Sequence, residues 1–200
     1  MDENIFDEMA ERFDTPEQIE LSEIIGEEIK KKLPDAGSKD LLEYGAGTGL
    51  VGLQLSGNVR SVQLVDSSEP MLNMAREKIS RRSLSNVHVQ HADFTKETPE
   101  LEADVIVMSL VLHHIHDAAG LLRQLFHVLR QGGRLLIVDF DKDETMDHHD
   151  HIHKTLSHDE LTALLTETGF SSTDIRTFHH GKGIFNEQDA SLFLADSVKE

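Results

Sequence analysis

The stretch from Leu41 to Gly49, LLEYGAGTG, constrains the fold of this chain more than any other. Its apolar half predicts a buried strand that ends at Gly45. Glycines at alternate positions then allow a sharp turn and a close approach of the backbone to a ligand, beside the start of the next helix. The window from Gly47 to Gly52 also fits G-x-G-x-x-G, but it begins two residues after the strand end, which is the wrong register for a dinucleotide fingerprint.

Strand and helix patterns alternate along the rest of the chain. The predicted strands are 41–44, 62–65, 87–89, 105–108 and 134–140. The predicted helices are one that begins after Thr15 with Pro16 and Gln18, then 50–55, 70–79, 118–129 closed by Gly132-Gly133, and one from the Ser157–Glu160 capping box to Gly169. This alternation predicts a doubly wound α/β sheet.

Two apolar runs follow the last predicted helix, Ile175–Phe178 and Ala190–Leu194. Because no helix pattern separates them, they predict an antiparallel hairpin at the edge of the sheet. The intervening His179-His180-Gly181 is interpreted as a turn.

Carboxylates stand at the ends of the next two predicted strands. Asp66 ends the second strand, 17 residues after Gly49, where it is placed to accept both hydroxyls of an adenosine ribose. Asp93 follows the third strand, where an acid can accept from an adenine amino group while Phe94 covers the ring. The alternative for both acids is a turn residue.

These motifs together resemble the class I S-adenosylmethionine-dependent methyltransferases, and most closely the branch that acts on small molecules. The motifs are Glu43-x-Gly45-x-Gly47-x-Gly49, Val65-Asp66-x-Ser68-x-x-Met71-Leu72, Ala92-Asp93-Phe94 and Leu112-His113-His114, within residues 38–140. The resemblance implies S-adenosylmethionine as the cofactor and a Rossmann-like sheet of seven strands, mostly parallel, with an antiparallel last strand.

The resemblance also assigns cofactor contacts along the first strand end. Glu43 and the backbone at Tyr44, Gly45 and Ala46 are expected to hold the methionine moiety, and Gly47 belongs to the same loop.

Further contacts are expected around the nucleoside. Asp66 takes the ribose hydroxyls with Ser67 beside it, Asp93 takes the adenine amino group, and the Phe94 backbone lies at the ring edge. Met71 packs against the adenine, with plain core packing as its alternative. Ser109, at the end of the fourth predicted strand, is expected near the transferred methyl group.

The charge of the chain restricts its partners. With 37 acidic and 19 basic residues the net charge is −18, which disfavours nucleic acid and anionic lipid surfaces. Residues 1–32 hold 11 acids and four bases, and residues 141–160 hold seven acids and two bases. We hypothesise that these segments cover the acceptor, together with Phe6, Phe13 and Ile19, and favour a neutral or cationic one.

The absence of cysteine excludes disulfides, thiolate metal sites and thiol nucleophiles. The start of the chain lacks the pattern of a signal peptide, and the longest apolar stretch, Val105–Leu112, is too short to cross a bilayer. We therefore expect a soluble, cytoplasmic protein.

Methyl transfer needs positioning of the acceptor more than any single catalytic group, so no catalytic residue is assigned. A base role is open for His113 or His114, which follow the fourth strand. The stretch Ser109–Leu112 replaces the Asn/Asp-Pro-Pro-Tyr type of motif that enzymes use on planar amino groups, so a small-molecule acceptor is favoured. The histidine-rich segment 147–153 is interpreted as a surface loop, and no functional metal is expected.

The expected organisation is one methyltransferase domain over residues 1–200. It comprises an N-terminal helical cap (1–37), a cofactor-binding core (38–140), and an acceptor-side segment with the closing hairpin (141–200). Two alternatives to a methyltransferase stay open, an NAD(P)-dependent oxidoreductase and a methyltransferase-like protein that binds the cofactor without turnover. Oligomeric state and acceptor atom are left open.

Overall fold

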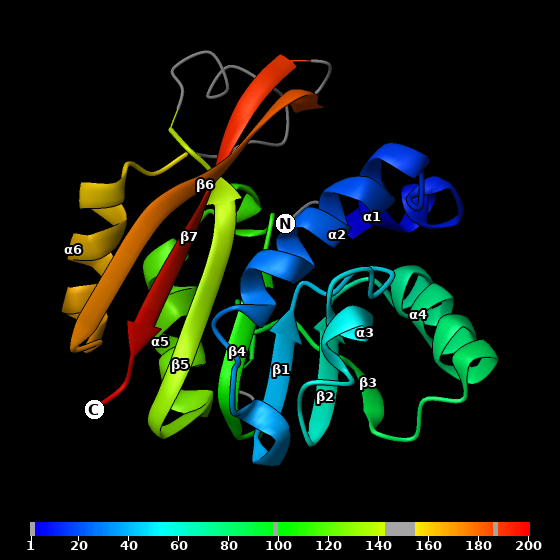
Figure 1. Cartoon of the computed structure of the whole chain (residues 1–200), viewed down its shortest axis with the longest axis horizontal. Coiled ribbons are helices and arrows are strands. Elements are labelled where there is room, and N and C mark those ends of the chain that lie inside the picture. Colours follow the sequence, from blue (N-terminus) through cyan, green and yellow to red (C-terminus); the bar gives the residue numbers. More distant parts are fainter. Residues whose placement is uncertain (1–2, 98–99, 143–154, 186–187) are drawn as a thin grey trace. The chain divides into compact units, whose positions relative to one another are not determined.

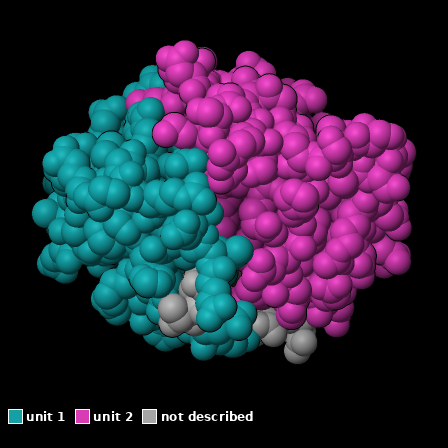
Figure 2. Space-filling view, turned by 90° about the horizontal axis from the view of Figure 1, so that it is seen from below, with its two compact units in different colours: residues 1, 94–200 teal, residues 2–93 magenta. Residues whose placement is uncertain are grey.

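The computed structural model describes residues 3–97, 100–142, 155–185 and 188–200. Seven strands are described in them, in the hydrogen-bonded order β3-β2-β1-β4-β5-β7-β6. The chain clusters into two compact units, which Figure 2 colours separately: unit 2 is residues 2–93, and unit 1 is residues 94–200 with Met1. Each unit is described by itself below.

Unit 2 alternates helices with three parallel strands (Figure 1). Its strands are β1 (Asp40–Tyr44), β2 (Ser61–Asp66) and β3 (Val87–His91). Its helices are α1 (Glu3–Met9), η1 (Ala10–Arg12), α2 (Pro16–Lys30), η2 (Ala36–Ser38), α3 (Gly52–Leu55) and α4 (Glu69–Arg82). The helix predicted over 50–55 is thus shorter at its start, because Leu50 and Val51 still belong to the turn that leaves the glycine loop.

Unit 1 holds the antiparallel part of the sheet. Its strands are β4 (Ala103–Ser109), β5 (Leu129–Phe140), β6 (Ser172–Phe185) and β7 (Gln188–Val198), and its helices are η3 (Leu112–His114), α5 (Ala118–Val128) and α6 (His158–Thr168). β4 pairs with β5 in parallel, while β7 runs antiparallel to both β5 and β6. The predicted mostly parallel sheet with an antiparallel last strand is confirmed.

The core of unit 1 shows why the apolar runs became central strands. Ile106, Val107 and Met108 of β4 are each 0% exposed, although successive residues of a strand face opposite sides of a sheet. Both faces of β4 are therefore covered, as predicted from its uninterrupted hydrophobic run. The buried stripe Leu121, Leu122 and Leu125 of α5 contributes to the same core.

The local signals for helix ends are confirmed where they depend on neighbouring residues. Ser157 Oγ accepts from the Glu160 N–H at 3.2 Å while the Glu160 side chain accepts from the Ser157 N–H at 2.9 Å, and Gly169 closes α6 with φ of 116°. At the start of α2, the Gln18 N–H donates to Thr15 Oγ1 at 3.2 Å. These caps satisfy backbone groups that the helix itself leaves without partners.

Two local predictions in unit 1 are wrong. The helix predicted to run to Leu129 and close at Gly132-Gly133 ends at Val128, and both glycines lie in β5. Gly132 adopts φ of 74°, its N–H donates to the Lys199 carbonyl at 2.7 Å, and the Lys199 N–H donates to the Gly133 carbonyl at 3.0 Å. The glycines therefore form a bulged strand that the distant C-terminal residues hold in place.

The predicted turn at His179-His180-Gly181 is the second error, since these residues lie within β6. His179 pairs with Leu192, His180 with Ser191 and Gly181 with Ala190 of β7. Pairing with a neighbouring strand outweighs the local preference of glycine for turns.

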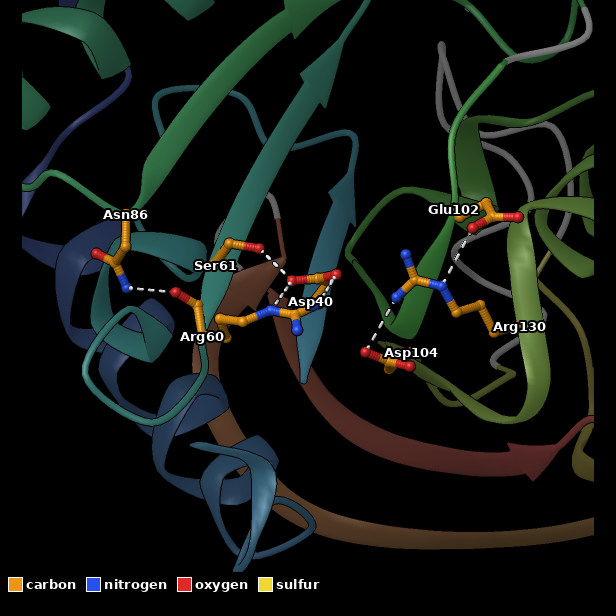
Figure 3. Close-up of polar contacts among 7 residues, drawn as sticks. All are labelled: Asp40, Arg60, Ser61, Asn86, Glu102, Asp104 and Arg130. Carbon is orange, nitrogen blue, oxygen red and sulfur yellow. Dashed lines mark hydrogen bonds and ion pairs between the residues drawn. The ribbon is translucent and has the colours of Figure 1, made fainter. Parts of the chain in front are cut away.

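Polar side chains at the amino ends of the strands hold each unit together locally (Figure 3). In unit 2, Asp40 accepts from Arg60 Nε at 2.8 Å and from Ser61 Oγ at 2.6 Å, and Asn86 Nδ2 donates to the Arg60 carbonyl at 3.4 Å. In unit 1, Arg130 donates to Glu102 at 3.3 Å and to Asp104 at 3.1 Å. We assign these partly exposed pairs to stability at the strand starts, with a small contribution each.

No helix in the described ranges is both long and apolar enough to cross a membrane.

Candidate cofactor-binding site

The carboxyl ends of the three strands of unit 2 meet at one edge. The N–H groups of Gly45 and Ala46 both donate to the Val65 carbonyl, at 2.8 and 3.0 Å, which holds the end of β1 beside β2. The Ala92 N–H donates to the Asp66 carbonyl at 3.0 Å and holds the end of β3 against β2. The predicted residues Gly45, Asp66 and Asp93 are therefore brought to the same edge of the sheet.

The glycine loop takes a conformation that other residues adopt rarely. Gly45, Gly47 and Gly49 have φ of 71°, 53° and 79°, in the left-handed region that favours glycine. A Cβ added at Gly47 would meet no heavy atom within 4 Å, so one side of its backbone is open. The backbone conformation at position 47 favours glycine, and the absence of a side chain leaves room for a ligand to approach the main chain.

Asp66, the last residue of β2, is hydrogen-bonded to the glycine loop. Its Oδ2 accepts from the Gly47 N–H at 2.7 Å and its Oδ1 from the Ser68 N–H at 2.9 Å. Burial raises the pKa of Asp66, which is 8% exposed, while the N–H groups of Ser68, Gly47 and Ser67 and the charge of His91 act in the opposite direction. Each carboxylate oxygen accepts up to two hydrogen bonds, so further acceptor capacity is left for hydroxyl donors.

Glu43 lies beneath the same loop and is 1% exposed. Its Oε2 accepts from the Gly52 N–H at 2.9 Å, at the start of α3. Burial raises the pKa of Glu43 to about 8, the Gly52 hydrogen bond acts against this shift, and the nearby Asp66 adds to it. In the structure Glu43 therefore anchors the helix that follows the loop.

The remaining predicted residues of unit 2 lie around these strand ends. Tyr44 Oη donates to Asp93 Oδ1 at 3.4 Å, which joins the end of β1 to the residue after β3. The Ser67 carbonyl lies 2.8 Å from His91 Nε2. Met71 is 1% exposed and its N–H donates to Ser68 Oγ at 3.3 Å, so in the structure it is a core residue of α4.

Two predicted cofactor residues belong to unit 1. Phe94 is 1% exposed, directly after Asp93 in the chain. Ser109 is the last residue of β4, as predicted, and is followed by Leu110 with the uncommon φ of 56°. A positive φ at a leucine costs free energy and is frequent at functional sites.

Sequence reasoning missed a polar cluster that ties the N-terminal segment to the glycine loop. Asp14 accepts from Thr48 Oγ1 at 2.5 Å and pairs with Lys78 Nζ at 2.5 Å. Lys78 Nζ also donates to the Thr48 carbonyl at 2.9 Å and to Thr48 Oγ1 at 2.8 Å. Burial lowers the pKa of Lys78, and the hydrogen bond and charge of Asp14 oppose that shift. No local pattern signals this cluster, because its members are far apart in the sequence.

A second contact of the same kind lies beside Asp66. Ser68 Oγ, which caps α4, donates to Asp7 Oδ1 of α1 at 2.5 Å. Two acids of the N-terminal segment are thus hydrogen-bonded to residues beside the predicted ribose site. Asp14 accepts from Thr48, which follows Gly47, and Asp7 accepts from Ser68, which follows Ser67.

Lys78→Met should loosen the N-terminal segment. The substitution keeps the length of the buried chain but leaves the carboxylate of Asp14, one quarter exposed, without its charged partner. We expect the free energy of unfolding to fall by about 1–3 kcal/mol, and amide hydrogen exchange to rise at residues 10–15. Arg81→Met on the same helix is the control, because Arg81 is 74% exposed and lies 3.7 Å from Glu77. Equal exchange rates in the two variants would contradict the role given to Lys78.

Metal ligands were not expected. Within the described residues, no group of three or more histidine or acidic side chains is arranged to hold a metal ion. The histidine-rich segment 147–153 lies outside the described residues.

Comparisons with known proteins bear on the family of the chain. Residues 36–185 match a family model described as a methyltransferase domain. A ubiquinone/menaquinone biosynthesis C-methyltransferase of Vibrio parahaemolyticus is 36% identical over 107 residues, which cover 51% of this chain and 41% of that protein. The chain spans about half the length of the curated relatives it matches.

Solved structures share the fold. A SAM-dependent methyltransferase from Aquifex aeolicus has a TM-score of 0.72 at 23% identity, with all of both chains covered. Phosphoethanolamine N-methyltransferase 2 of Haemonchus contortus, solved with S-adenosyl-L-methionine, has a TM-score of 0.75 at 16% identity, covering 97% of this chain and 60% of that one. At these identities the likeness concerns the fold.

Proposed function

The chain belongs to the methyltransferase domain family, and we propose that it transfers a methyl group from S-adenosylmethionine to a small-molecule acceptor. The observation that carries the proposal is Asp66, a buried carboxylate that holds the open glycine loop through Gly47 and keeps acceptor capacity. The family match describes a methyltransferase domain, so it gives no support to an NAD(P)-dependent oxidoreductase.

The residues of unit 2 fit S-adenosylmethionine by their donors and acceptors. Asp66 would accept from the ribose hydroxyls, with Ser67 next to it. The half-buried Asp93 would accept from the adenine amino group, while the open backbone at Gly47 leaves space for the ligand. When bound, the cofactor supplies a sulfonium methyl group with a good leaving group already attached.

The other assignments belong to the same proposal. Glu43 and the backbone at Tyr44, Gly45 and Ala46 would hold the methionine moiety. Met71, which is in the core of α4, would form the floor under the adenine.

In unit 1, the Phe94 backbone would lie at the edge of the adenine ring, and Ser109 would lie near the methyl group.

The proposed acceptor is a small molecule, because a net charge of −18 disfavours a nucleic acid or an anionic lipid surface. The single-domain organisation with segments 1–37, 38–140 and 141–200, and a cytoplasmic location, remain part of this proposal. The curated relatives are named as C-methyltransferases of ubiquinone and menaquinone biosynthesis, and these names support a small-molecule acceptor.

Asp66→Ala should weaken the binding of S-adenosylmethionine by about 1.5–3 kcal/mol, or roughly 10- to 150-fold in Kd, through the loss of hydrogen bonds to a charged acceptor. Isothermal titration calorimetry measures this directly. Asp40→Ala is the control, because it removes a carboxylate from the opposite end of β1. Unchanged affinity in Asp66→Ala would refute the ribose role, and binding of NAD without S-adenosylmethionine would refute the proposed function.

A further inference from the structure

Unit 1 contains a buried histidine–aspartate pair at the carboxyl ends of two parallel strands. His113 lies in η3, shortly after β4, and Asp139 is the second-last residue of β5. His113 Nδ1 lies 2.6 Å from Asp139 Oδ1, and the side chains are 5% and 4% exposed. In open α/β sheets, ligands bind outside the carboxyl ends of the strands, so the pair occupies a place suited to acceptor chemistry.

The hydrogen bonds around Asp139 fix the orientation of the ring. Its carboxylate accepts from the His113 N–H at 3.2 Å and from the Phe140 N–H at 2.8 Å, in addition to the ring contact. Because an ionised carboxylate only accepts, the proton of the neutral imidazole lies on Nδ1 and the lone pair on Nε2. This is the tautomer that an aspartate imposes on a histidine that acts as a general base.

Asp139 bonds to only one of the two ring nitrogens of His113. Within the described part of the chain, no buried side-chain nitrogen or oxygen lacks a hydrogen-bond partner, and the hydrogen bond of the His113 ring runs through Nδ1. The ring is held from other sides by the His114 ring, with centroids 4.0 Å apart, and by the edge of Phe140 at 5.4 Å. Two titratable groups contact the ring in the described residues, Asp139 from β5 and His114 from η3.

The structure thus distinguishes two histidines that the sequence left as alternatives. Asp139 orients His113 through its ring and its backbone N–H together. His114 is half-buried and stacks obliquely on that ring. An acid near the end of an apolar strand, as in Ile137-Val138-Asp139, is the sequence signal for the partner.

We propose that His113, positioned by Asp139, is the general base of the reaction, and that the acceptor carries a hydroxyl proton, as a phenol or an enol does. The inference rests on the proposed function and names its substrate class. Nε2 takes the hydroxyl proton, and the electron pair left on the acceptor forms the bond to the methyl carbon. The pair of the broken carbon–sulfur bond stays on the sulfur, which becomes a neutral thioether, and the imidazolium later releases its proton to water.

An amine or thioether acceptor would not need this base, because each already presents a lone pair to the methyl group. A purely structural pair is the other possibility, since Asp139 also holds the backbone of η3. The experiments below separate these outcomes.

The first experiment measures S-adenosylhomocysteine formation by the 200-residue chain with phenol, 4-nitrophenol and aniline as probe acceptors. His113→Gln should lower kcat with phenol about 100-fold or more, while the loss with 4-nitrophenol, which ionises near neutral pH without help, stays below about tenfold. Asp139→Asn should lower kcat with phenol as well, because the amide no longer imposes the same tautomer. His127→Gln, at an exposed position of α5, should change nothing.

The affinity for S-adenosylmethionine, measured by calorimetry on each variant, separates the two proposals. Wild-type chain that does not bind it contradicts the proposed function. Where the wild-type chain does bind S-adenosylmethionine, two results contradict the present inference. His113→Gln could keep full activity, or it could lose activity equally with both phenols. Transfer to aniline alone, or no transfer to either phenol, also contradicts the inference.

The second experiment does not depend on turnover. Nitrogen-15 NMR of the histidines at pH 8, with His113→Gln to assign the signal, should show the His113 proton on Nδ1 and an unprotonated Nε2. Asp139→Asn should change this pattern in a chain whose circular dichroism is unaltered. A proton on Nε2 in the wild type would overturn the base role.

Discussion

The free energy of unfolding should fall as the pH rises from about 5 to about 8, and Glu43→Gln should remove most of that fall. Glu43 is 1% exposed, and its burial raises the pKa to about 8 from the ordinary value of 4.5. Between these values the folded chain keeps a proton that the unfolded chain has released. The folded state therefore loses stability as the pH rises through this window.

The expected size follows from the shift. One pKa unit corresponds to about 1.4 kcal/mol, so the three units between pH 5 and pH 8 contain a loss of about 4 kcal/mol. The side-chain amide introduced by Glu43→Gln stays neutral at every pH and retains a carbonyl oxygen for the Gly52 N–H, which is why the slope should flatten. Asp66, whose pKa is also raised, leaves a smaller fall with the same sign.

Urea denaturation at pH 5 and pH 8 measures the effect. Glu27→Gln is the control, because Glu27 is exposed, pairs with Lys30 at 2.7 Å, and has a pKa that this hydrogen bond and charge lower. Its pH dependence should parallel that of the wild type. A curve for Glu43→Gln that also ran parallel to the wild type would contradict a proton on Glu43 in the folded chain.

Gly52→Ala should destabilise the chain by about 3 kcal/mol. A Cβ at this position would clash with Glu43 Oε2 and would lie 2.5 Å from Leu64 Cδ2. Neither neighbour can easily move, because Glu43 is bonded to the Gly52 N–H and Leu64 is 0% exposed. Overpacking of this kind typically costs about 1–3 kcal/mol, and displacement of Glu43 also weakens a buried hydrogen bond.

Gly57→Ala is the control for Gly52→Ala. A Cβ at Gly57 would meet nothing within 4 Å, so we expect a change of less than about 1 kcal/mol. Thermal or urea unfolding of both variants tests the difference. Equal stability of the two would show that the region around α3 relaxes freely, against the packing described.

Both predictions concern the contact between Glu43 and Gly52, two residues that belong to different motifs in the sequence. Glu43 was assigned from its motif to the cofactor, while Gly52 completed a glycine pattern in the wrong register. The structure places the glycine against the acid, nine residues away. The need for glycine at position 52 thus comes from packing against Glu43 and Leu64, and that need could not be read from the spacing of the glycines.

At Gly132 and at His179–Gly181 the local sequence pattern was misleading. Local preference predicts a helix end and a turn there, whereas the structure has β5 and β6. Backbone bonds to Lys199 and pairing with β7 decide both segments, and these partners lie far along the chain. Only tertiary contacts carry that information.

The sequence by itself determined the alternation of strands and helices, the helix caps, and the placement of Gly45, Asp66 and Asp93 at strand ends. Each of these depends on neighbours within a few residues, through hydrophobic periodicity, capping bonds and the conformational freedom of glycine. Because β1, β2 and β3 pair in parallel, their carboxyl ends lie at the same edge of the sheet.

The tertiary structure alone decided which side chains touch across long stretches of chain. Lys78 meets Asp14 and Thr48, and Asp139 meets His113 across 26 residues. Such pairs have no periodic signature, because the distance between two side chains is set by how whole elements pack. The gathering of Gly45, Asp66 and Asp93 at the strand ends was therefore predictable, while the pairs that join distant segments of the chain were not.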